Sequence, residues 1–298
     1  MKFLCSLIAL LVFVTGCGSF AHRSERTVTE SLETSPLEQL VLKTFNGAVT
    51  VKTHDEPTVE LEVTYAAYGA SEEEAEANCQ QLSTEMAADN GKLSLTASKP
   101  SGQWNASASY KLTVPRNCSL DLNSSNGTIK VAQLIGDVKV KTSNGRIEIE
   151  KVLGNLTVDT SNGRVVVKDI SGIVDVETSN GKIEYSGIPV GESSRLRSSN
   201  GSVIANVGLS STVLVSASTS NGKISCVAEQ YQEEPGGSKK RKSILIGDAS
   251  RTPAKLTIRT SNGSIALGDY DANKASSSEE PPASEVDSSD FAKEEISE

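Results

Sequence analysis

The chain has 298 residues, which is long enough for one large domain or two ordinary ones. Aromatic residues make up only 4% of it, which argues against a thick globular core built on large rings and favours thin β structure filled by Val, Ile and Leu. The net charge of −9 is unevenly spread, because residues 271–298 carry nine acidic and two basic side chains and the remainder is close to neutral.

The first 16 residues have the features of an export signal. Lys2 supplies a positive charge, residues 3–14 are almost wholly apolar, and Cys17 follows the small residue Gly16. This arrangement resembles the signal of bacterial lipoproteins, in which the cysteine receives a diacylglycerol and becomes the mature N-terminus. We therefore expect residues 1–16 to be removed and Cys17 to be lipidated. An ordinary secretory signal with an incidental cysteine is the alternative.

The segment 17–36 is polar and predicts a tether between the lipid and a folded domain. No later segment approaches the roughly 20 apolar residues that a membrane helix needs, so the lipid is the expected membrane attachment. Gly18 stands where enteric-type bacteria use Asp to retain lipoproteins at the inner membrane. We therefore favour the outer membrane of a bacterial cell envelope.

An Asn-Gly pair recurs through residues 37–270, with steps of 18 residues between several middle copies. The glycines of these pairs are Gly47, Gly127, Gly145, Gly163, Gly181, Gly201, Gly222 and Gly263. Around each glycine, mostly apolar residues stand seven and five positions before it and two and four positions after it. Polar residues stand between them. This period of two predicts two half-buried strands per repeat.

Stacking the repeats as coils would bury all the apolar columns against one another. The expected fold is therefore all-β, a two-sheet β-solenoid of about 18-residue coils. An antiparallel meander of hairpins is the alternative, and the constant step favours coils. The repeated corner is expected to be a structural turn, formed at the centre of the chain by Asn144, Gly145, Asn162, Gly163, Asn180 and Gly181. Stacked Asn amides can bond along the solenoid, while inward Thr or Ser can satisfy the corner backbone.

Two segments depart from the repeat. Ser71 and Glu74 form a capping box that predicts one helix over residues 72–86, with an apolar face that includes Ala75 and Cys79. Strands are expected near residues 58–65, 92–97 and 107–114, and the helix should cap one end of the solenoid. Residues 228–243 predict a loop insertion, and residues 271–298 a disordered acidic tail.

Catalytic groups are sparse in the sequence. His22 and His54 are the only histidines, and neither stands beside a nucleophile motif. Cys79, Cys118 and Cys226 lack metal-binding spacing and allow one disulfide at most. We expect no catalytic residues, metal, cofactor or nucleic-acid partner. The rival hypothesis is a polysaccharide lyase or glycosidase that uses outward carboxylates, the candidates being Glu148, Glu150, Asp159, Glu177 and Glu184.

A column of cations follows the Asn-Gly corners. Its members are Arg146, Arg164, Lys182 and Lys223. Like charges stacked at strand spacing cost stability unless something compensates them. This corner column is therefore a candidate site for an anionic ligand, and neutralisation by Glu148 and Glu184 is the alternative.

The segments "LVLKTFNGAVTV" (residues 40–51) and "YKLTVPRNCSLDLNSSNGTIKV" (residues 110–131), followed by the "TSNGxI" coils, resemble a bacterial β-strand repeat family of unknown function. Members are labelled as proposed adhesins. The resemblance covers roughly residues 40–269 and implies no catalytic residues. It favours a non-enzymatic, lipid-anchored envelope protein whose surface serves adhesion or scaffolding, with an anionic polysaccharide or envelope protein as partner. An envelope-stress sensor is a further alternative.

Overall fold

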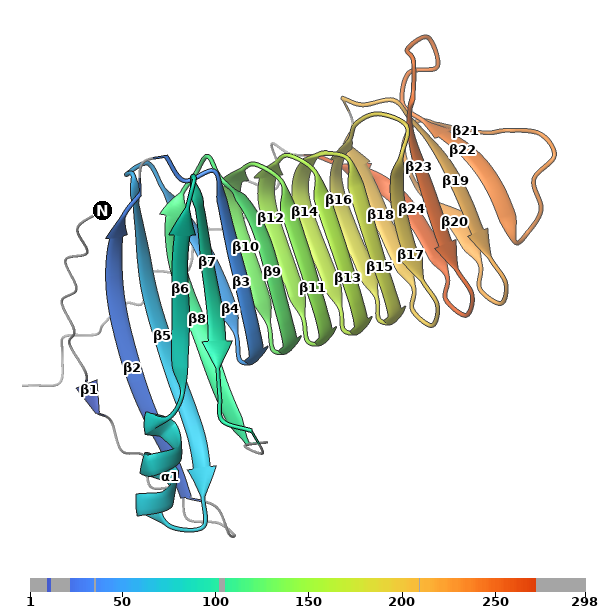
Figure 1. The fold of residues 1–298 in the computed structure, drawn as a ribbon. Helices are drawn as coiled ribbons and strands as arrows, with labels where there is room; N and C mark the ends of the chain where they lie inside the picture. Colours follow the sequence, from blue (N-terminus) through green and yellow to red (C-terminus); the bar gives the residue numbers. More distant parts are fainter. Residues whose placement is uncertain (1–9, 12–21, 35, 102–104, 209, 272–298) are drawn as a thin grey trace, which may run out of the picture.

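The structure, a computed structural model, describes residues 10–11, 22–34, 36–101, 105–208 and 210–271. Cys17, most of residues 1–16 and the acidic tail beyond Asp271 lie outside the described residues. Two long sheets stand face to face as the layers of a flattened tube (Figure 1). The expected two-sheet solenoid is confirmed.

Sheet I contains, in spatial order, β1 (Leu10–Leu11), β2 (His22–Glu33), β5 (Thr58–Gly69), β8 (Ala106–Pro115), β4 (Val49–His54), β10 (Ile129–Ile135), β12 (Ile147–Leu153), β14 (Val165–Gly172), β16 (Ile183–Pro189), β18 (Val203–Gly208), β24 (Ile265–Tyr270) and β20 (Ile224–Cys226). Sheet II contains β21 (Tyr231–Glu233), β22 (Arg241–Ile246), β19 (Val213–Thr219), β23 (Ala254–Thr260), β17 (Ser194–Ser198), β15 (Val174–Asn180), β13 (Leu156–Asn162), β11 (Val138–Asn144), β9 (Ser119–Asn126), β3 (Gln39–Asn46), β7 (Lys92–Ser98) and β6 (Ser83–Asp89). The described helix is α1 (Glu72–Gln80).

Each coil contributes one strand to each sheet, and neighbouring coils pair in parallel and in register. Ile147 of β12, for example, lies beside Ile129 of β10 on one side and Val165 of β14 on the other. The parallel pairing excludes the antiparallel meander. The inward columns form one continuous core, in which Leu122 and Val140 are almost completely buried.

The predicted tether of residues 17–36 is wrong in part, because much of it is a strand at the N-terminal end of the solenoid. Residues 22–33 form strand β2, which pairs antiparallel with β5 along its whole length. The segment reads as polar because it has few apolar residues, of which Val28 and Leu32 pack against the core. Arg26 completes the docking, since its guanidinium donates to the Leu82 carbonyl at 2.7 Å.

The predicted helix is correct in its start and wrong in its length. The Ser71 hydroxyl accepts from the Glu74 amide at 3.1 Å, as a capping residue does, and Ala75 and Cys79 are buried against β2 and β5. The chain then leaves the helix, and Ser83–Asp89 forms edge strand β6 against β7. Backbone pairing with the open edge of β7 overrides the helical pattern at these positions.

At the C-terminal end the coils do not stack in chain order. After β17 and β18 the chain passes over one position and places β19 and β20 two strand positions farther along the tube. It then returns, so that β23 lies between β17 and β19 and β24 lies between β18 and β20 (Figure 1).

The predicted loop 228–243 is wrong in part, because it contains β21 and the start of β22, which pairs antiparallel with β19. This hairpin covers an edge of sheet II that would otherwise be open.

Candidate functional site

The repeated asparagines form a continuous ladder of side-chain hydrogen bonds. Asn144 donates to Asn126 at 2.7 Å, Asn162 to Asn144 at 2.9 Å, and Asn180 to Asn162 at 2.9 Å. The ladder extends to Asn46 at one end and to Asn221 at the other. Because each amide donates to one coil and accepts from the next, the row ties neighbouring coils together.

The corner glycines are required chiefly by the close approach of stacked coils. A Cβ added at Gly163 would lie 1.9 Å from the carbonyl oxygen of Gly145, and one at Gly181 would lie 1.8 Å from that of Gly163. Gly145 also has a φ of 142°, but Gly163 and Gly181 do not have a left-handed backbone. A side chain at these positions would push the coils apart.

Three cations of the corner column, Arg146, Arg164 and Lys182, lie on adjacent coils and pair with carboxylates. Glu148 contacts Arg146 at 2.5 Å, while Glu184 contacts both Arg164 and Lys182 at 2.5 Å. The hydrogen bond from Lys130 is the largest influence on Glu148 and helps to hold its pKa below the usual value. Over these coils, the positive charge of the corner column is therefore compensated by carboxylates of the protein itself.

For Glu184, partial burial raises the pKa, but the hydrogen bonds and charges of Arg164 and Lys182 outweigh this effect and the net pKa is lowered. Lys223 lies farther along, where its side chain has no ion-pair partner among the described residues.

The candidate catalytic carboxylates are divided between the two sheets. Glu148, Glu150 and Glu184 stand on sheet I, while Asp159 and Glu177 stand on sheet II. Those on sheet II face Lys141 and Arg197, each at 3.7 Å, and Glu150 faces Lys151 at 3.6 Å. Within the described ranges, no three His, Cys, Asp or Glu side chains are grouped so as to hold a metal ion.

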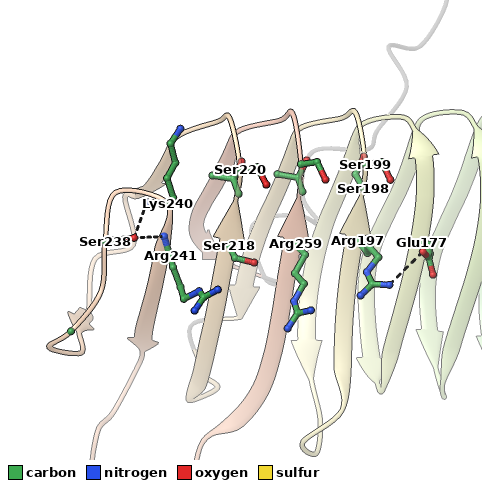
Figure 2. Close-up of a pocket in the computed structure, with 14 residues that line it drawn as sticks. Glu177, Arg197, Ser198, Ser199, Ser218, Ser220, Ser238, Lys240, Arg241 and Arg259 are labelled. Atoms are coloured by element: carbon green, nitrogen blue, oxygen red, sulfur yellow. Dashed lines mark hydrogen bonds and ion pairs between the residues drawn. The ribbon is translucent and has the colours of Figure 1, made fainter.

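A different basic surface lies on the outer face of sheet II, near its C-terminal end. Arg197 comes from β17, Arg259 from β23 and Arg241 from β22. We call the surface that they line the arginine groove. It comprises a hollow of about 690 Å³ and an adjoining one of about 530 Å³, which share Arg241, Arg259, Ser218 and Gly236. Figure 2 shows Arg197, Arg259 and Arg241 extending from the same side of the sheet.

The sequence patterns described above did not predict this groove. Arg197 and Arg259 both stand four positions before a corner glycine. This shared position in the repeat is the sequence feature that could have predicted their alignment in one row. Chain order would place Ser218 between them. In the fold they are direct neighbours, because β23 inserts beside β17.

A family profile described as Toastrack DUF4097 matches residues 43–268. The chain belongs to this family. The match spans every coil of the toastrack solenoid and stops short of both termini. No curated protein matches the chain.

Several solved structures resemble this toastrack protein at low identity. A proposed cell adhesion protein from Clostridium sporogenes is 11% identical, with a TM-score of 0.40 over 83% of this chain and 100% of that one. A proposed adhesin from Bacteroides fragilis is 13% identical, with a TM-score of 0.41 over 81% and 96%. A proposed lipid-binding protein from Parabacteroides distasonis is 14% identical, with a TM-score of 0.31 over 81% and 96%.

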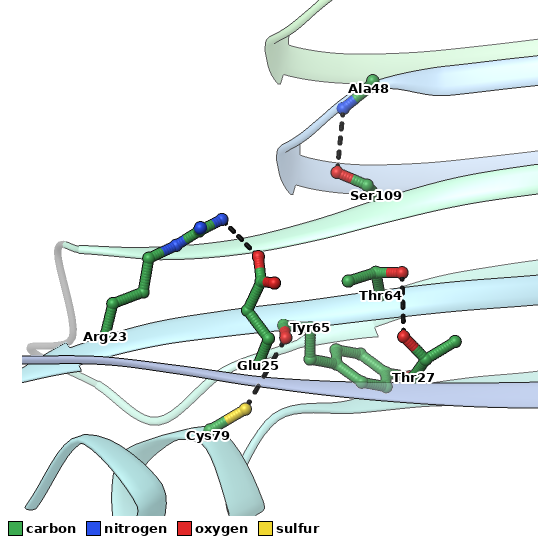
Figure 3. A network of polar contacts seen from close by, with 8 residues as sticks. All are labelled: Arg23, Glu25, Thr27, Ala48, Thr64, Tyr65, Cys79 and Ser109. Carbon is green, nitrogen blue, oxygen red and sulfur yellow. Dashed lines mark hydrogen bonds and ion pairs between the residues drawn. The ribbon is translucent and has the colours of Figure 1, made fainter. Parts of the chain in front are cut away.

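The helix-bearing end of the toastrack protein carries a second polar network (Figure 3). Arg23 pairs with Glu25 along β2, and the Thr27 and Thr64 hydroxyls lie 3.2 Å apart between β2 and β5. The Cys79 thiol donates to the Tyr65 carbonyl at 3.6 Å, which joins the helix to the sheet. The Thr27–Thr64 and Cys79–Tyr65 contacts join neighbouring elements, so we assign the network a structural role.

The three cysteines of the toastrack domain, Cys79, Cys118 and Cys226, are all free thiols. Burial raises the pKa of Cys118 to about 11, so this thiol stays protonated near neutral pH. None of the helices in the described part of the chain is long and apolar enough to cross a membrane.

Proposed function

We propose that this protein is a non-enzymatic, lipid-anchored protein of the bacterial envelope, whose solenoid serves as an extended surface for adhesion or scaffolding. We further propose that it binds anionic envelope polymers. The observation that carries the proposal is the unbroken stack of coils, which repeats outward side chains at the spacing of neighbouring strands, about 4.8 Å. A polymer with repeating charges can meet many such positions at once, and several weak contacts then add up to firm binding.

The rival carbohydrate-active enzyme receives less support. The outward carboxylates are paired with cations and lie on two different sheets, whereas glycoside cleavage needs two carboxyl groups on either side of one bond. The corner column remains a candidate binding surface. Because Glu148 and Glu184 already compensate three of its cations, we expect it to contribute little affinity.

The proposed binding is tested with the purified full-length protein and isolated envelope polymers, anionic and neutral. We expect saturable binding of the anionic polymers that weakens as salt is raised, because exposed charges are screened over about 10 Å at moderate salt. Equal retention of neutral polymers, or no retention of any polymer, would overturn the proposal.

The proposed anchor is tested separately in growing bacteria supplied with a labelled fatty acid. We expect the wild-type chain to carry the label and to sediment with the outer membrane, and Cys17→Ala to lose both properties. A labelled Cys17→Ala chain would sink the assignment of Cys17 as the lipidated residue.

A further inference from the structure

We propose that the arginine groove is a specific binding site for an acidic polysaccharide. This inference rests on the proposed function and deepens it, because it assigns the anionic ligand to the outer face of sheet II under the β21–β22 hairpin. The corner column is then a structural feature and not the main binding site.

The arginines of the groove place like charges close together. Arg197 of β17 and Arg259 of β23 stand directly opposite each other in adjacent parallel strands. Arg241 follows in the same row, one strand beyond Ser218. The row therefore presents three guanidinium groups over about 14 Å, the width of three strand spacings. Like charges at such positions destabilise a sheet unless another group compensates them.

Little in the protein compensates these charges. Glu177 approaches Arg197 at 3.7 Å, at the end of the row nearest the middle of sheet II. Among the described residues, the side chains of Arg241 and Arg259 have no hydrogen-bond or ion-pair partner. The corner column differs in this respect, since Glu148 and Glu184 contact three of its cations. An anionic ligand would supply the missing partner in the arginine groove.

The side chains of the groove indicate which kind of anion it would bind. A guanidinium group offers two parallel N–H donors that match a carboxylate or phosphate group. The larger hollow is otherwise lined mainly by hydroxyl side chains, of which Ser199, Ser218, Ser220 and Ser261 are not buried. Hydroxyl groups both donate and accept, as the hydroxyls of a sugar do.

The lining also argues against other polymers. None of the described lining residues of either hollow is aromatic, so the groove has no ring on which a nucleic-acid base could stack. These features together favour a sugar polymer with carboxylate or phosphate groups over a nucleic acid.

The β21–β22 hairpin completes one wall of the groove. Lys242 is tied to Glu233 at 2.6 Å and Ser243 to Glu234 at 2.5 Å, which braces the two strands of the hairpin against each other. Lys240 donates to the Gly222 carbonyl at 2.7 Å and joins the hairpin to the corner of the last coil. These bonds position the hairpin wall without using the guanidinium groups of Arg241 and Arg259.

The experiment measures binding of labelled polygalacturonate fragments to the full-length protein by fluorescence anisotropy, with neutral dextran as the ligand control. The groove variant is Arg241→Ser with Arg259→Ser, a change suited to the site because Ser218 already occupies the same row. The matched control is Arg146→Ser with Arg164→Ser, which removes the same charge from the corner column. A third variant, Arg241→Lys with Arg259→Lys, keeps the charge and removes the paired donors. Circular dichroism checks that each variant is folded.

We expect the groove variant to bind at least about tenfold more weakly, because charge-assisted hydrogen bonds are lost. The control should stay within about twofold, since its cations are already paired. The lysine variant should fall between the two. If the wild-type protein binds but the groove variant binds equally well, the groove assignment is overturned while the proposed function stands.

Two further arms test the class of ligand. Polyglutamate is measured as a competitor, because the acidic segment 271–298 of the same chain could occupy the groove. If polyglutamate binds there and polygalacturonate does not, an acidic peptide is the ligand and the proposal fails. The measurement is repeated on full-length protein with Glu279, Glu280 and Glu285 changed to Gln, so that occupancy by the tail is not mistaken for a lack of affinity. No binding of polygalacturonate by either chain would overturn the inference.

Discussion

Asn162 donates a hydrogen bond of 2.9 Å to the side-chain oxygen of Asn144, which lies 18 residues earlier in the chain and one coil away in space. Asn180 makes the same bond to Asn162. The spacing of the repeat thus equals one circuit of the solenoid. Each corner asparagine therefore links neighbouring coils, and the repeated Ser-Asn-Gly has a structural role.

Asn162→Ala should destabilise the protein by about 1–2 kcal/mol, because it removes two ladder bonds that are each worth about 1 kcal/mol. The urea midpoint of unfolding measures the change. Ser161→Ala is the matched control, since Ser161 is equally exposed and its side chain has no partner among the described residues. Equal midpoints for the two variants would show that the ladder adds no stability.

Gly163→Ala should be more harmful than its size suggests. The new Cβ would lie 1.9 Å from the Gly145 carbonyl oxygen, so the coils must separate. We expect a loss of about 1–3 kcal/mol or more, as for overpacked cores. Gly237→Ala is the comparison, because the nearest atom there is 3.1 Å away. A thermal midpoint unchanged in Gly163→Ala would contradict the tight stacking of the corners.

Tyr185→Phe should leave the stability unchanged or raise it. Tyr185 is only 1% exposed, and its hydroxyl has no hydrogen-bond partner among the described residues, so removal of the hydroxyl also removes a desolvation cost. Tyr110→Phe is the contrast, because that hydroxyl contacts the Thr84 hydroxyl at 2.8 Å. Its loss should cost about 0.5–1.5 kcal/mol. The thermal midpoint should therefore fall in Tyr110→Phe and not in Tyr185→Phe, and a larger loss in Tyr185→Phe would refute this interpretation of the core.

Glu184→Gln should reduce stability at neutral pH and have a smaller effect in acid. The net pKa of Glu184 lies below 4.5 in the folded protein because Arg164 and Lys182 outweigh the effect of partial burial. A carboxyl group with a lowered folded pKa stabilises the protein above its unfolded pKa and loses that contribution as the pH falls through the folded pKa. For a partly exposed pair we expect about 0.2–1 kcal/mol near pH 7 and a smaller difference at acid pH, below the folded pKa. Urea unfolding of both proteins at neutral and acid pH checks this, and a difference that does not shrink in acid would contradict it.

The repeat was predictable because it depends on local and periodic features. The buried columns around Leu122, Val140 and Ile147 follow from alternation, and parallel stacking follows from the constant step. The ends were less predictable, because edge strands owe their conformation to a partner distant in the chain. Strand β2 has few apolar residues of its own, and β6 follows directly after a helix, so both needed the sheet beside them.

Residues close together in the chain were enough to predict the two-sheet solenoid, the length of its coils and the position of the helix start. The placement of β23 beside β17, which brings Arg259 opposite Arg197, could be seen only in the folded chain. It could not be predicted because stacked coils of similar shape can pack in more than one order. The order is set by the whole excursion through β19 to β22, which lies between Arg197 and Arg259 in the chain.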